Sequence, residues 1–421
     1  MTRWLKGWNV YQRGVTRRRP NKVCLHNNGV FIKESVLTRT QAERAFLVAV
    51  THRGSDCWST ASSLEELAEL VATAGANVAG KATQRLAMPE KTTYIGKGKL
   101  EEIIALKQSL DYNVVIFDGE LSPLQQRNLE EAFGVKIIDR AALILDIFAR
   151  HARTREGQLQ VELAQHQYLL PRLAGQWQHL ERLGAGIGTR GPGESQLETD
   201  RRLIKHKIDH LKKQLEQVSN HRRLYRDRRK KNSIPIIALV GYTNVGKSTL
   251  LNALTRAGVG VADKLFATLD PVTRRIELPE RRVVLLTDTV GFIRKLPPTL
   301  VAAFRATLEE LNEADLLLHV IDASSANAAL QSQTVEKILN DMNLSGKPRV
   351  TAVNKIDRLL DKSKTWDEKS ALDYLSGQTL DVAPGTALIS AAKGWGINQL
   401  LSMISSTLPQ PELQNQAYHA L

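Results

Sequence analysis

Cysteine is nearly absent from this chain of 421 residues, since only Cys24 and Cys57 occur, far apart and in no C-x-x-C pattern. This scarcity excludes a disulfide framework and gives no support to a structural zinc site. Apolar runs are short as well, and none approaches the roughly 18 residues needed to cross a bilayer. We therefore expect no membrane span and a reducing compartment, with the cytoplasm favoured over an organellar matrix.

Acidic residues are scarce in two segments, although the net charge of the whole chain is only +14. Residues 1–33 contain eight Lys or Arg and no acid, and residues 201–231 contain thirteen Lys or Arg against three acids, which leaves a net charge of −4 on the rest. Such concentrated positive charge favours a polyanionic partner. We interpret residues 1–40 as an unstructured basic tail or an upstream start-site artefact, ahead of organelle targeting.

Residues 41–152 alternate short apolar runs with amphipathic stretches. The runs "AFLVAV" and "NVVIFDG" are typical of buried strands, and "SLEELAELVATAG" and "KLEEIIALKQSL" are typical of helices, with a further helix start at Ser122-Pro123. This alternation predicts a small parallel α/β domain. The stretch "YIGKGKL" at 94–100 lacks the full spacing of a phosphate loop, and we expect no ligand there.

Residues 153–232 repeat apolar residues at helical steps. The two series are Leu159, Leu163, Leu170, Leu173, Trp177 and Leu180, then Leu197, Ile204, Ile208, Leu211, Leu215, Val218 and Tyr225. They predict two long antiparallel helices packed along one seam, with Pro171 as a candidate kink in the first.

The segment between these helices, "GAGIGTRGPG" at 184–193, contains a formal G-x-G-x-x-G match. A dinucleotide site requires a strand before the glycines, and here a helix precedes them, so we reject a phosphate site. A flexible turn is one interpretation. We favour a loop that presses its backbone against a partner, because two to eight residues suffice to connect two helices.

Residues 233–408 carry five apolar strand candidates separated by helical segments, ahead of a short tail at 409–421. The candidates are "IPIIALVG", "RRVVLLTDTVG", "DLLLHVIDAS", "PRVTAVNKID" and "TALIS". This repeat predicts a doubly wound parallel sheet. The predicted fold class is therefore α/β: an N-terminal parallel α/β domain, a long antiparallel helical hairpin, then a doubly wound parallel α/β domain.

The stretch "GYTNVGKST" satisfies G-x-x-x-x-G-K-[ST] between a strand and a helix, which is the context that this motif requires. Its backbone N–H groups would hold phosphates, Lys247 would reach the β and γ oxygens, and Ser248 would bind Mg²⁺. The predicted nucleotide contacts here are Gly241, Tyr242, Thr243, Asn244, Val245, Gly246, Lys247, Ser248 and Thr249.

The stretch "DTVG" at 288–291 ends the next long strand, where a carboxylate can hold Mg²⁺ through water and a Gly N–H can sense the γ-phosphate. The segment before it should hold a switch with a Mg²⁺-binding Thr, and we prefer Thr268 to Thr273. Predicted nucleotide contacts are Phe266, Ala267, Thr268, Leu269, Asp288, Thr289, Val290 and Gly291. We expect Lys247, Thr268 and Gly291 to carry the catalysis.

The stretch "NKID" at 354–357 determines the base, because Asp357 can accept from guanine N1–H and N2–H and adenine has no 2-amino group. Asn354 and Lys355 would brace the loop, and the Ala391 amide of "SAAKG" would donate to guanine O6. Predicted contacts are Asn354, Lys355, Ile356, Asp357, Ser390, Ala391 and Ala392. The predicted ligands are GTP and GDP, and the doubly wound domain is therefore predicted to be a P-loop GTPase domain.

Position 292 is Phe, where Ras-like GTPases carry the Gln that orients the attacking water. Intrinsic hydrolysis should therefore be slow, with a partner or another ion supplying the missing stabilisation. Asn244 could offer a carbonyl oxygen to K⁺; a loop Asn that bonds the backbone is an equal alternative.

Together, "GYTNVGKS", "LFATLDP", "DTVGF", "NKID" and "SAAKG", preceded by "RGPGESQLETDRR", resemble the HflX family of translational GTPases. The resemblance implies binding to the large ribosomal subunit and its rRNA, splitting or rescue of stalled ribosomes, and Mg²⁺ bound by Ser248 and Thr268. It also implies rRNA contacts from the glycine-rich loop, through Arg182, Gly184, Gly186, Gly188, Arg190, Gly191 and Gly193. We expect a monomer, and an rRNA-remodelling or ribosome-assembly factor is the alternative function.

Overall fold

The computed structural model describes residues 43–51, 58–173, 192–230, 234–255, 265–266, 268–295, 310–361, 363–377 and 385–408. The basic segment 1–33, both cysteines and the tail 409–421 lie outside these ranges. Within the described part, no helix combines the length and the apolar character needed to cross a membrane.

The N-terminal domain is built on a four-stranded parallel sheet with the order β2-β1-β3-β4. Its strands are β1 (Arg44–Thr51), β2 (Asn77–Arg85), β3 (Val114–Phe117) and β4 (Lys136–Asp139). Its helices are α2 (Thr60–Thr73), α3 (Lys97–Ala105), α4 (Lys107–Leu110), α5 (Pro123–Phe133) and α6 (Arg140–His151). The parallel α/β prediction is confirmed, although β2 and β4 had no clear signal in the sequence.

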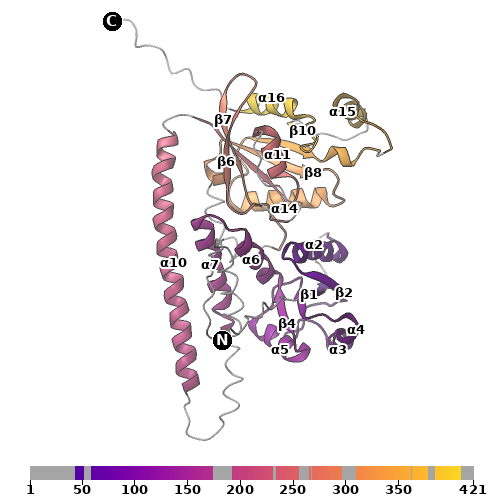
Figure 1. Ribbon diagram of the computed structural model, residues 1–421, viewed down its shortest axis with the longest axis vertical. Coiled ribbons are helices and arrows are strands. Elements are labelled where there is room, and N and C mark those ends of the chain that lie inside the picture. The colour runs from indigo at the N-terminus through magenta and orange to yellow at the C-terminus, as the bar shows by residue number, and fades with distance from the viewer. Residues whose placement is uncertain are drawn as a thin grey trace, which may run out of the picture. The chain divides into compact units, whose positions relative to one another are not determined.

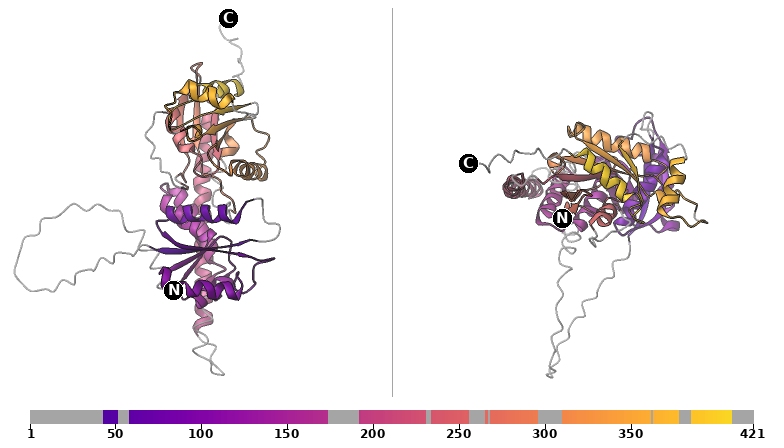
Figure 2. Two further views of the ribbon diagram at one scale, coloured as in Figure 1. Left: turned by 90° about the vertical axis from the view of Figure 1, so that its right-hand side faces the viewer. Right: turned by 90° about the horizontal axis from the view of Figure 1, so that it is seen from above.

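Helices cover both faces of this sheet (Figure 2). Successive side chains of a strand point to opposite faces, so Leu47 packs with α2 and α6 whereas Phe46 and Val48 pack with α3 and α5. At the predicted start of α5, Ser122 forms a reciprocal capping box with Gln125. The "YIGKGKL" stretch forms the start of α3, where the Gly96 N–H donates to Gln84 Oε1 at 2.9 Å.

Two helices follow and lie side by side, α7 (Arg155–Leu169) and α10 (Pro192–Lys230) (Figure 1). Leu159 of α7 and Ile208 and Leu211 of α10 are buried, as the apolar stripes predict. The first helix is shorter than expected, since α7 ends at Leu169. Pro171 therefore follows the helix and does not kink it.

The end of the predicted glycine-rich loop at 184–193 differs in one respect from the prediction. Residues 174–191, which include Arg182, Gly184, Gly186, Gly188, Arg190 and Gly191, lie outside the described residues. Gly193 was expected in the loop and instead lies in the first turn of α10. The reason is Pro192, whose fixed φ favours the first helical position.

The third region is a six-stranded sheet with the order β10-β9-β8-β5-β7-β6. Its strands are β5 (Ile236–Gly241), β6 (Val272–Glu277), β7 (Val283–Asp288), β8 (Leu316–Asp322), β9 (Arg349–Asn354) and β10 (Thr386–Leu388). Its helices are α11 (Lys247–Thr255), α14 (Ala328–Asp341), η3 (Ile356–Arg358), α15 (Glu368–Gly377) and α16 (Ile397–Thr407). The five predicted strands are parallel, and β6 adds an antiparallel edge that the prediction of an all-parallel sheet missed.

Candidate functional site

The loops that follow the carboxyl ends of β5, β7, β9 and β10 meet at one edge of the sheet and line a common pocket, which is where open α/β sheets bind ligands. Apart from Arg358, every lining residue belongs to a stretch that the motifs singled out. The lining consists of Thr243, Asn244, Gly246, Lys247, Ser248, Thr249, Phe266, Thr268, Thr289, Gly291, Asn354, Lys355, Asp357, Arg358, Ala391 and Ala392. Segments far apart in the chain thus converge on one site.

Lys247, in the first turn of α11, is buried at the floor of this pocket. Its Nζ donates to the Gly241 and Tyr242 carbonyls at 3.1 and 2.7 Å. Burial lowers the pKa of Lys247 to about 8, although Asp288 acts in the opposite direction. The ammonium is therefore poorly compensated by the chain and is placed to gain from an anion.

Gly291 approaches this lysine so closely that a side chain would not fit. A Cβ at Gly291 would lie 2.9 Å from Lys247 Nζ and 2.8 Å from Thr243 Cα. Gly is therefore required where the "DTVG" turn passes over the phosphate loop, and its backbone faces the pocket that Lys247 occupies.

Three oxygens of the predicted magnesium site converge. Ser248 Oγ lies 2.8 Å from Thr268 Oγ1, and the two hydroxyls lie 2.6 and 3.0 Å from Asp288 Oδ2. Burial raises the pKa of Asp288, and its Oδ1 is buried without a hydrogen-bond partner among the described residues. Such hard oxygen donors, one of them unsatisfied, suit Mg²⁺. Thr273 lies instead on β6, where its hydroxyl contacts Thr287.

The loops after β9 and β10 are tied to the phosphate loop by Asn354, whose Nδ2 donates to the Val245 carbonyl at 2.8 Å. Lys355 Nζ donates to the Asn244 carbonyl at 2.7 Å, and Asp357 Oδ1 accepts from Ser390 Oγ at 2.6 Å. The Ala391 N–H donates to Asn354 Oδ1 at 3.0 Å, so guanine O6 would have to share it. These bonds hold the loop that carries Asp357 against the phosphate loop, and Asp357 lines the same pocket as Lys247.

Phe292 does not line the pocket. Its side chain is buried in the hydrophobic core, and its backbone pairs with the Gly241 carbonyl and the Thr243 N–H. The Phe292 side chain therefore packs in the core, and it carries no polar group that could orient water.

Tyr242 belongs to the phosphate-loop motif, yet its side chain leaves the nucleotide pocket and enters the N-terminal domain. The hydroxyl donates to Glu66 Oε2 at 2.6 Å and accepts from the Arg294 N–H at 3.0 Å, and the ring stacks on Trp58. The motif alone had placed Tyr242 among the nucleotide contacts, and no local pattern predicted this interdomain role.

A charged cluster lies next to Tyr242, formed by the buried Asp118 and Arg140, the largely buried Glu66 and the partly exposed Lys295. Arg140 Nη1 donates to Asp118 Oδ1 at 2.7 Å, Arg140 also pairs with Glu66, and Lys295 Nζ donates to Asp118 Oδ2 at 2.5 Å. Lys295 lies three residues after Phe292, the last residue of the "DTVGF" stretch, so this cluster joins that stretch to the N-terminal domain.

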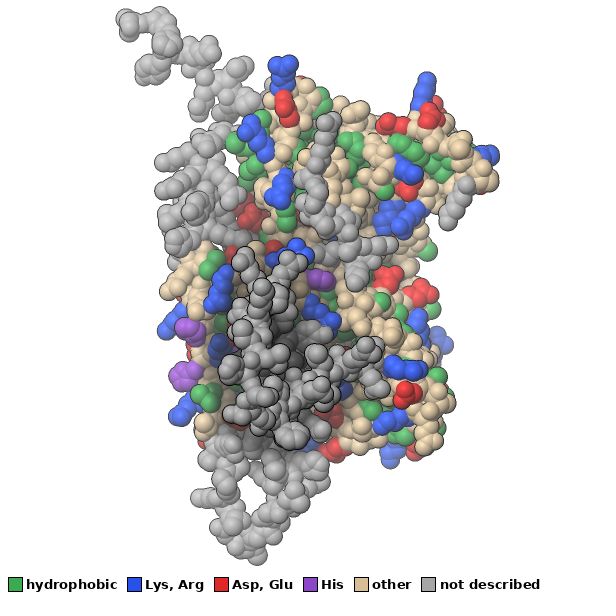
Figure 3. All heavy atoms as spheres, viewed as in Figure 1, with side chains coloured by type: hydrophobic (Ala, Val, Ile, Leu, Met, Phe, Trp, Pro, Cys, Tyr) green, Lys and Arg blue, Asp and Glu red, His purple; other side chains and the backbone are tan. Residues whose placement is uncertain are grey.

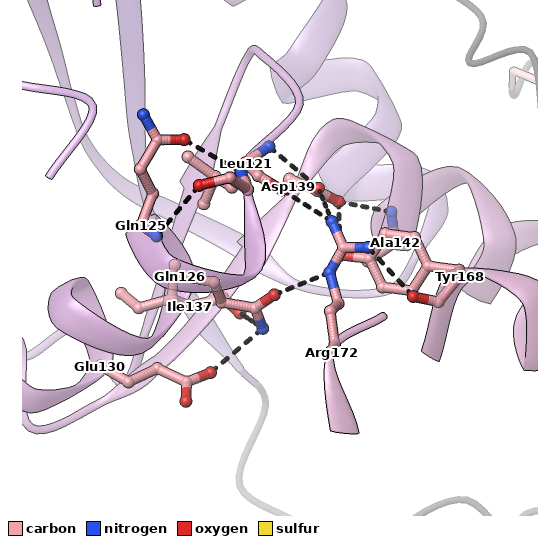
Figure 4. Close-up of polar contacts among 10 residues, drawn as sticks. Leu121, Gln125, Gln126, Glu130, Ile137, Asp139, Ala142, Tyr168 and Arg172 are labelled. Carbon is pink, nitrogen blue, oxygen red and sulfur yellow. Dashed lines mark hydrogen bonds and ion pairs between the residues drawn. The ribbon is translucent and has the colours of Figure 1, made fainter. Parts of the chain in front are cut away.

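The root of the predicted rRNA-binding loop is held by Arg172, which follows α7 (Figure 4). Its guanidinium donates to Asp139 Oδ2 at 3.0 Å, the Leu121 carbonyl at 2.8 Å and Gln126 Oε1 at 3.0 Å, and it stacks 3.5 Å from the centre of the Tyr168 ring. Tyr168 in turn donates to Asp139 Oδ1 at 2.9 Å. The chain therefore leaves the N-terminal domain toward residues 174–191 from a fixed point.

The α10 helix exposes much of the second basic segment. The exposed cations on its described side chains are Arg201, Arg202, Lys205, Lys207, Lys212 and Lys213. Lys, Arg and His side chains stand along the edge of the molecule where α10 lies (Figure 3). Within the described part, Lys207 is the one of these cations that forms an ion pair with α7, at 3.0 Å from Glu162. The others could contact a polyanion without breaking an ion pair to α7.

Comparison with known families matches most of the described part of the chain, from residue 61 onward, in four consecutive or overlapping pieces. Residues 61–149 match "GTP-binding GTPase N-terminal" and 151–229 match "GTP-binding GTPase Middle Region". Residues 236–355 match "50S ribosome-binding GTPase" and 304–410 match "Elongation factor Tu GTP binding domain".

Similar solved structures include a GTP-binding protein from Sulfolobus solfataricus in complex with GDP, at 27% identity over 87% of this chain and 98% of that one, with a TM-score of 0.44. Among curated relatives, GTPase HflX of Caldanaerobacter subterraneus is 56% identical over 75% of this chain and 73% of its own length. GTPase HflX of Escherichia coli is 45% identical over 82% of this chain and 79% of its own length. On these matches the chain belongs to the HflX family and is a GTP-hydrolysing enzyme.

Proposed function

We propose that this HflX-family GTPase binds the large ribosomal subunit and, in its GTP state, splits or rescues stalled ribosomes. The observation that carries the proposal is the exposed row of cations on α10, from Arg201 to Lys213. Neutralising rRNA phosphates releases counterions, so binding should weaken steeply with salt. The family description "50S ribosome-binding GTPase" supports the same partner.

At the GTP site, the phosphate-loop amides and Lys247 hold the β and γ phosphates in this proposal. Ser248 and Thr268 would hold Mg²⁺, with Asp288 holding it through water, and the Gly291 N–H would contact the γ-phosphate. The ion would neutralise negative charge on the phosphates. A K⁺ ion at Asn244 is a further part of the proposal, and turnover in K⁺ against Na⁺ tests it.

Because Phe292 cannot orient the attacking water, we propose that the large subunit supplies the group that does so. We expect slow turnover by the free protein and faster turnover when rRNA or a ribosomal protein supplies the missing group. Turnover that is the same with and without large subunits would contradict this part of the proposal.

Sucrose-gradient sedimentation tests the splitting activity. Intact 70S particles incubated with the protein and a non-hydrolysable GTP analogue should separate into subunits, with the protein on the large one. Replacing Lys212 and Lys213 by Glu should abolish this effect, and replacing the exposed Lys337 of α14 by Glu should not. Particles that remain intact would contradict splitting, and activity on naked rRNA alone would favour the remodelling or assembly factor.

The proposed role of Asp357 has its own test. In Asp357→Asn, the side chain no longer accepts from both guanine N–H donors, and its amide can donate to the 2-oxygen of xanthine. We expect the affinity for GTP to fall by about 10²-fold and the affinity for xanthosine triphosphate to rise. Unchanged GTP affinity would remove Asp357 from the base site.

A further inference from the structure

Asp270 links the nucleotide pocket to the helical hairpin. It lies two residues after Thr268, and its carboxylate reaches the start of α7, more than one hundred residues earlier in the chain. Asp270 Oδ2 accepts from the Arg153 and Thr154 N–H groups at 2.7 and 2.8 Å, and Oδ1 accepts from the Thr154 hydroxyl. Thr154 is itself the N-cap of α7 and accepts from the Gly157 N–H at 3.0 Å.

The helix is shaped to receive this carboxylate. A Cβ placed on Gly157, in the first turn of α7, would overlap with Asp270 Oδ1. Gly is otherwise unfavourable inside a helix. Its presence in α7 is therefore explained by the close approach of Asp270.

A second contact fixes the other side of Thr268. The buried Phe266 ring packs edge-on against Phe148 of α6, with 4.7 Å between the ring centres. The Thr268 hydroxyl between these two anchors bonds to Ser248 and Asp288. The segment that places Thr268 in the predicted magnesium site therefore also places Asp270 against the start of α7.

We propose that Asp270 is a positioning residue that couples the nucleotide state to the hairpin: when Thr268 binds the metal with GTP, Asp270 holds Thr154, the N-cap residue of α7, and when Thr268 withdraws, these bonds are lost. Two residues span at most about 7 Å, so a displacement of Thr268 by several ångströms breaks the bonds of Asp270. From the capped end, α7 runs about 22 Å to the Arg172 anchor at the root of residues 174–191. The inference rests on the proposed role of Thr268 and makes no use of ribosome binding.

The first test compares nucleotide affinities of the full-length chain in the absence of ribosomes. By linkage, an interaction made only in the GTP state raises the affinity for GTP relative to GDP. For Asp270→Ala we expect the preference for a GTP analogue over GDP to fall about fivefold, the typical worth of a helix cap, with GDP affinity unchanged. The matched control is Asp367→Ala, because Asp367 accepts from the Ser370 N–H at the start of α15, away from the pocket.

Variants on α7 separate coupling from damage to the fold. Thr154→Val should reduce the same preference, and the double variant Asp270→Ala/Thr154→Val should show less than the sum of the two effects. Gly157→Ala raises helix propensity, yet it should lower the GTP preference because the methyl group displaces Asp270. If Asp270→Ala weakens both nucleotides equally, or if the two effects add, the coupling is refuted.

Amide hydrogen exchange supplies a direct readout. In the wild-type chain, residues 155–160 should exchange more slowly with the GTP analogue than with GDP, and Asp270→Ala should remove this difference. Exchange that is independent of the nucleotide would overturn the inference. A negative sedimentation experiment would leave this result untouched, so the two proposals can fail separately.

Discussion

Two buried cations lie on either side of Tyr242 and differ in what surrounds them. Lys247 faces the nucleotide pocket and, among the residues that the structure describes, bonds only to backbone carbonyls, whereas Arg140 is enclosed by the carboxylates of Asp118 and Glu66. Burial lowers the pKa of both, that of Lys247 to about 8 and that of Arg140 to about 10. Lys247, which lines an open pocket and has no carboxylate within hydrogen-bond distance among the described residues, can therefore bind an anionic ligand. Arg140, which is enclosed by carboxylates, instead stabilises the fold.

Replacing Lys247 by Met should produce the largest effect on chemistry. The variant loses a charge that stabilises the transition state, and we expect GTP turnover to fall by about 10²–10³-fold. Stability without nucleotide should not fall, because the side chain that is removed is a buried and poorly compensated ammonium. Turnover assays and urea unfolding check both outcomes, with Lys337→Met as the control. A strong loss of stability would mean that Lys247 is structural, like Arg140.

Replacing Arg140 by Met should show the opposite profile. The buried carboxylate of Asp118 would keep the Ser63 hydroxyl and Lys295 but lose its buried cation, and Glu66 would keep the hydroxyl of Tyr242. Removing one partner from a buried ion pair typically costs about 3 kcal/mol or more. Urea unfolding measures this loss, and turnover by the folded fraction should fall far less than in Lys247→Met. A fully stable Arg140→Met protein would show that the cluster does not hold the fold.

The two sites also differ in how well the sequence predicts them. Lys247 and the residues around it lie in short motifs whose flanking strands and helices are recognisable, so the pocket could be assembled from local patterns. Arg140 and its partners come from α2, the end of β3, the start of α6 and the turn after "DTVGF". The periodicity of a sequence does not reveal contacts between such distant segments. For the same reason, the contact between Asp270 and the start of α7 could not be predicted.

The missed strands have a related cause. The β2 and β6 strands lie at sheet edges, and their sequences NVAGKATQR and VTRRIE contain few large apolar residues. An edge strand is half solvated, so its pattern lacks the apolar run that reveals a central parallel strand. The central strands β3, β5 and β8 are almost continuously apolar and were predicted.

Tyr242 tests whether the two cations act separately, since its carbonyl accepts from Lys247 and its hydroxyl bonds to Glu66. In Tyr242→Phe, we expect the free energy of unfolding to fall by about 1.5–3 kcal/mol, the worth of a hydrogen bond to a charged group. The carbonyl remains, so GTP turnover should change by less than about threefold. A tenfold change would show that the charged cluster controls Lys247 through this ring.

The smallest effect concerns pH and belongs to Lys247 alone. Without nucleotide, its pKa of about 8 lies below the usual 10.5, so the folded protein binds fewer protons than the unfolded chain between these values and stability rises with pH there. Bound GTP favours the charged form, so binding above pH 8 must take up a proton. We expect the affinity to weaken about fourfold between pH 7 and pH 8.5. Calorimetry in buffers of different ionisation enthalpy should detect this proton uptake, and its absence would place Lys247 among ordinary, fully charged lysines.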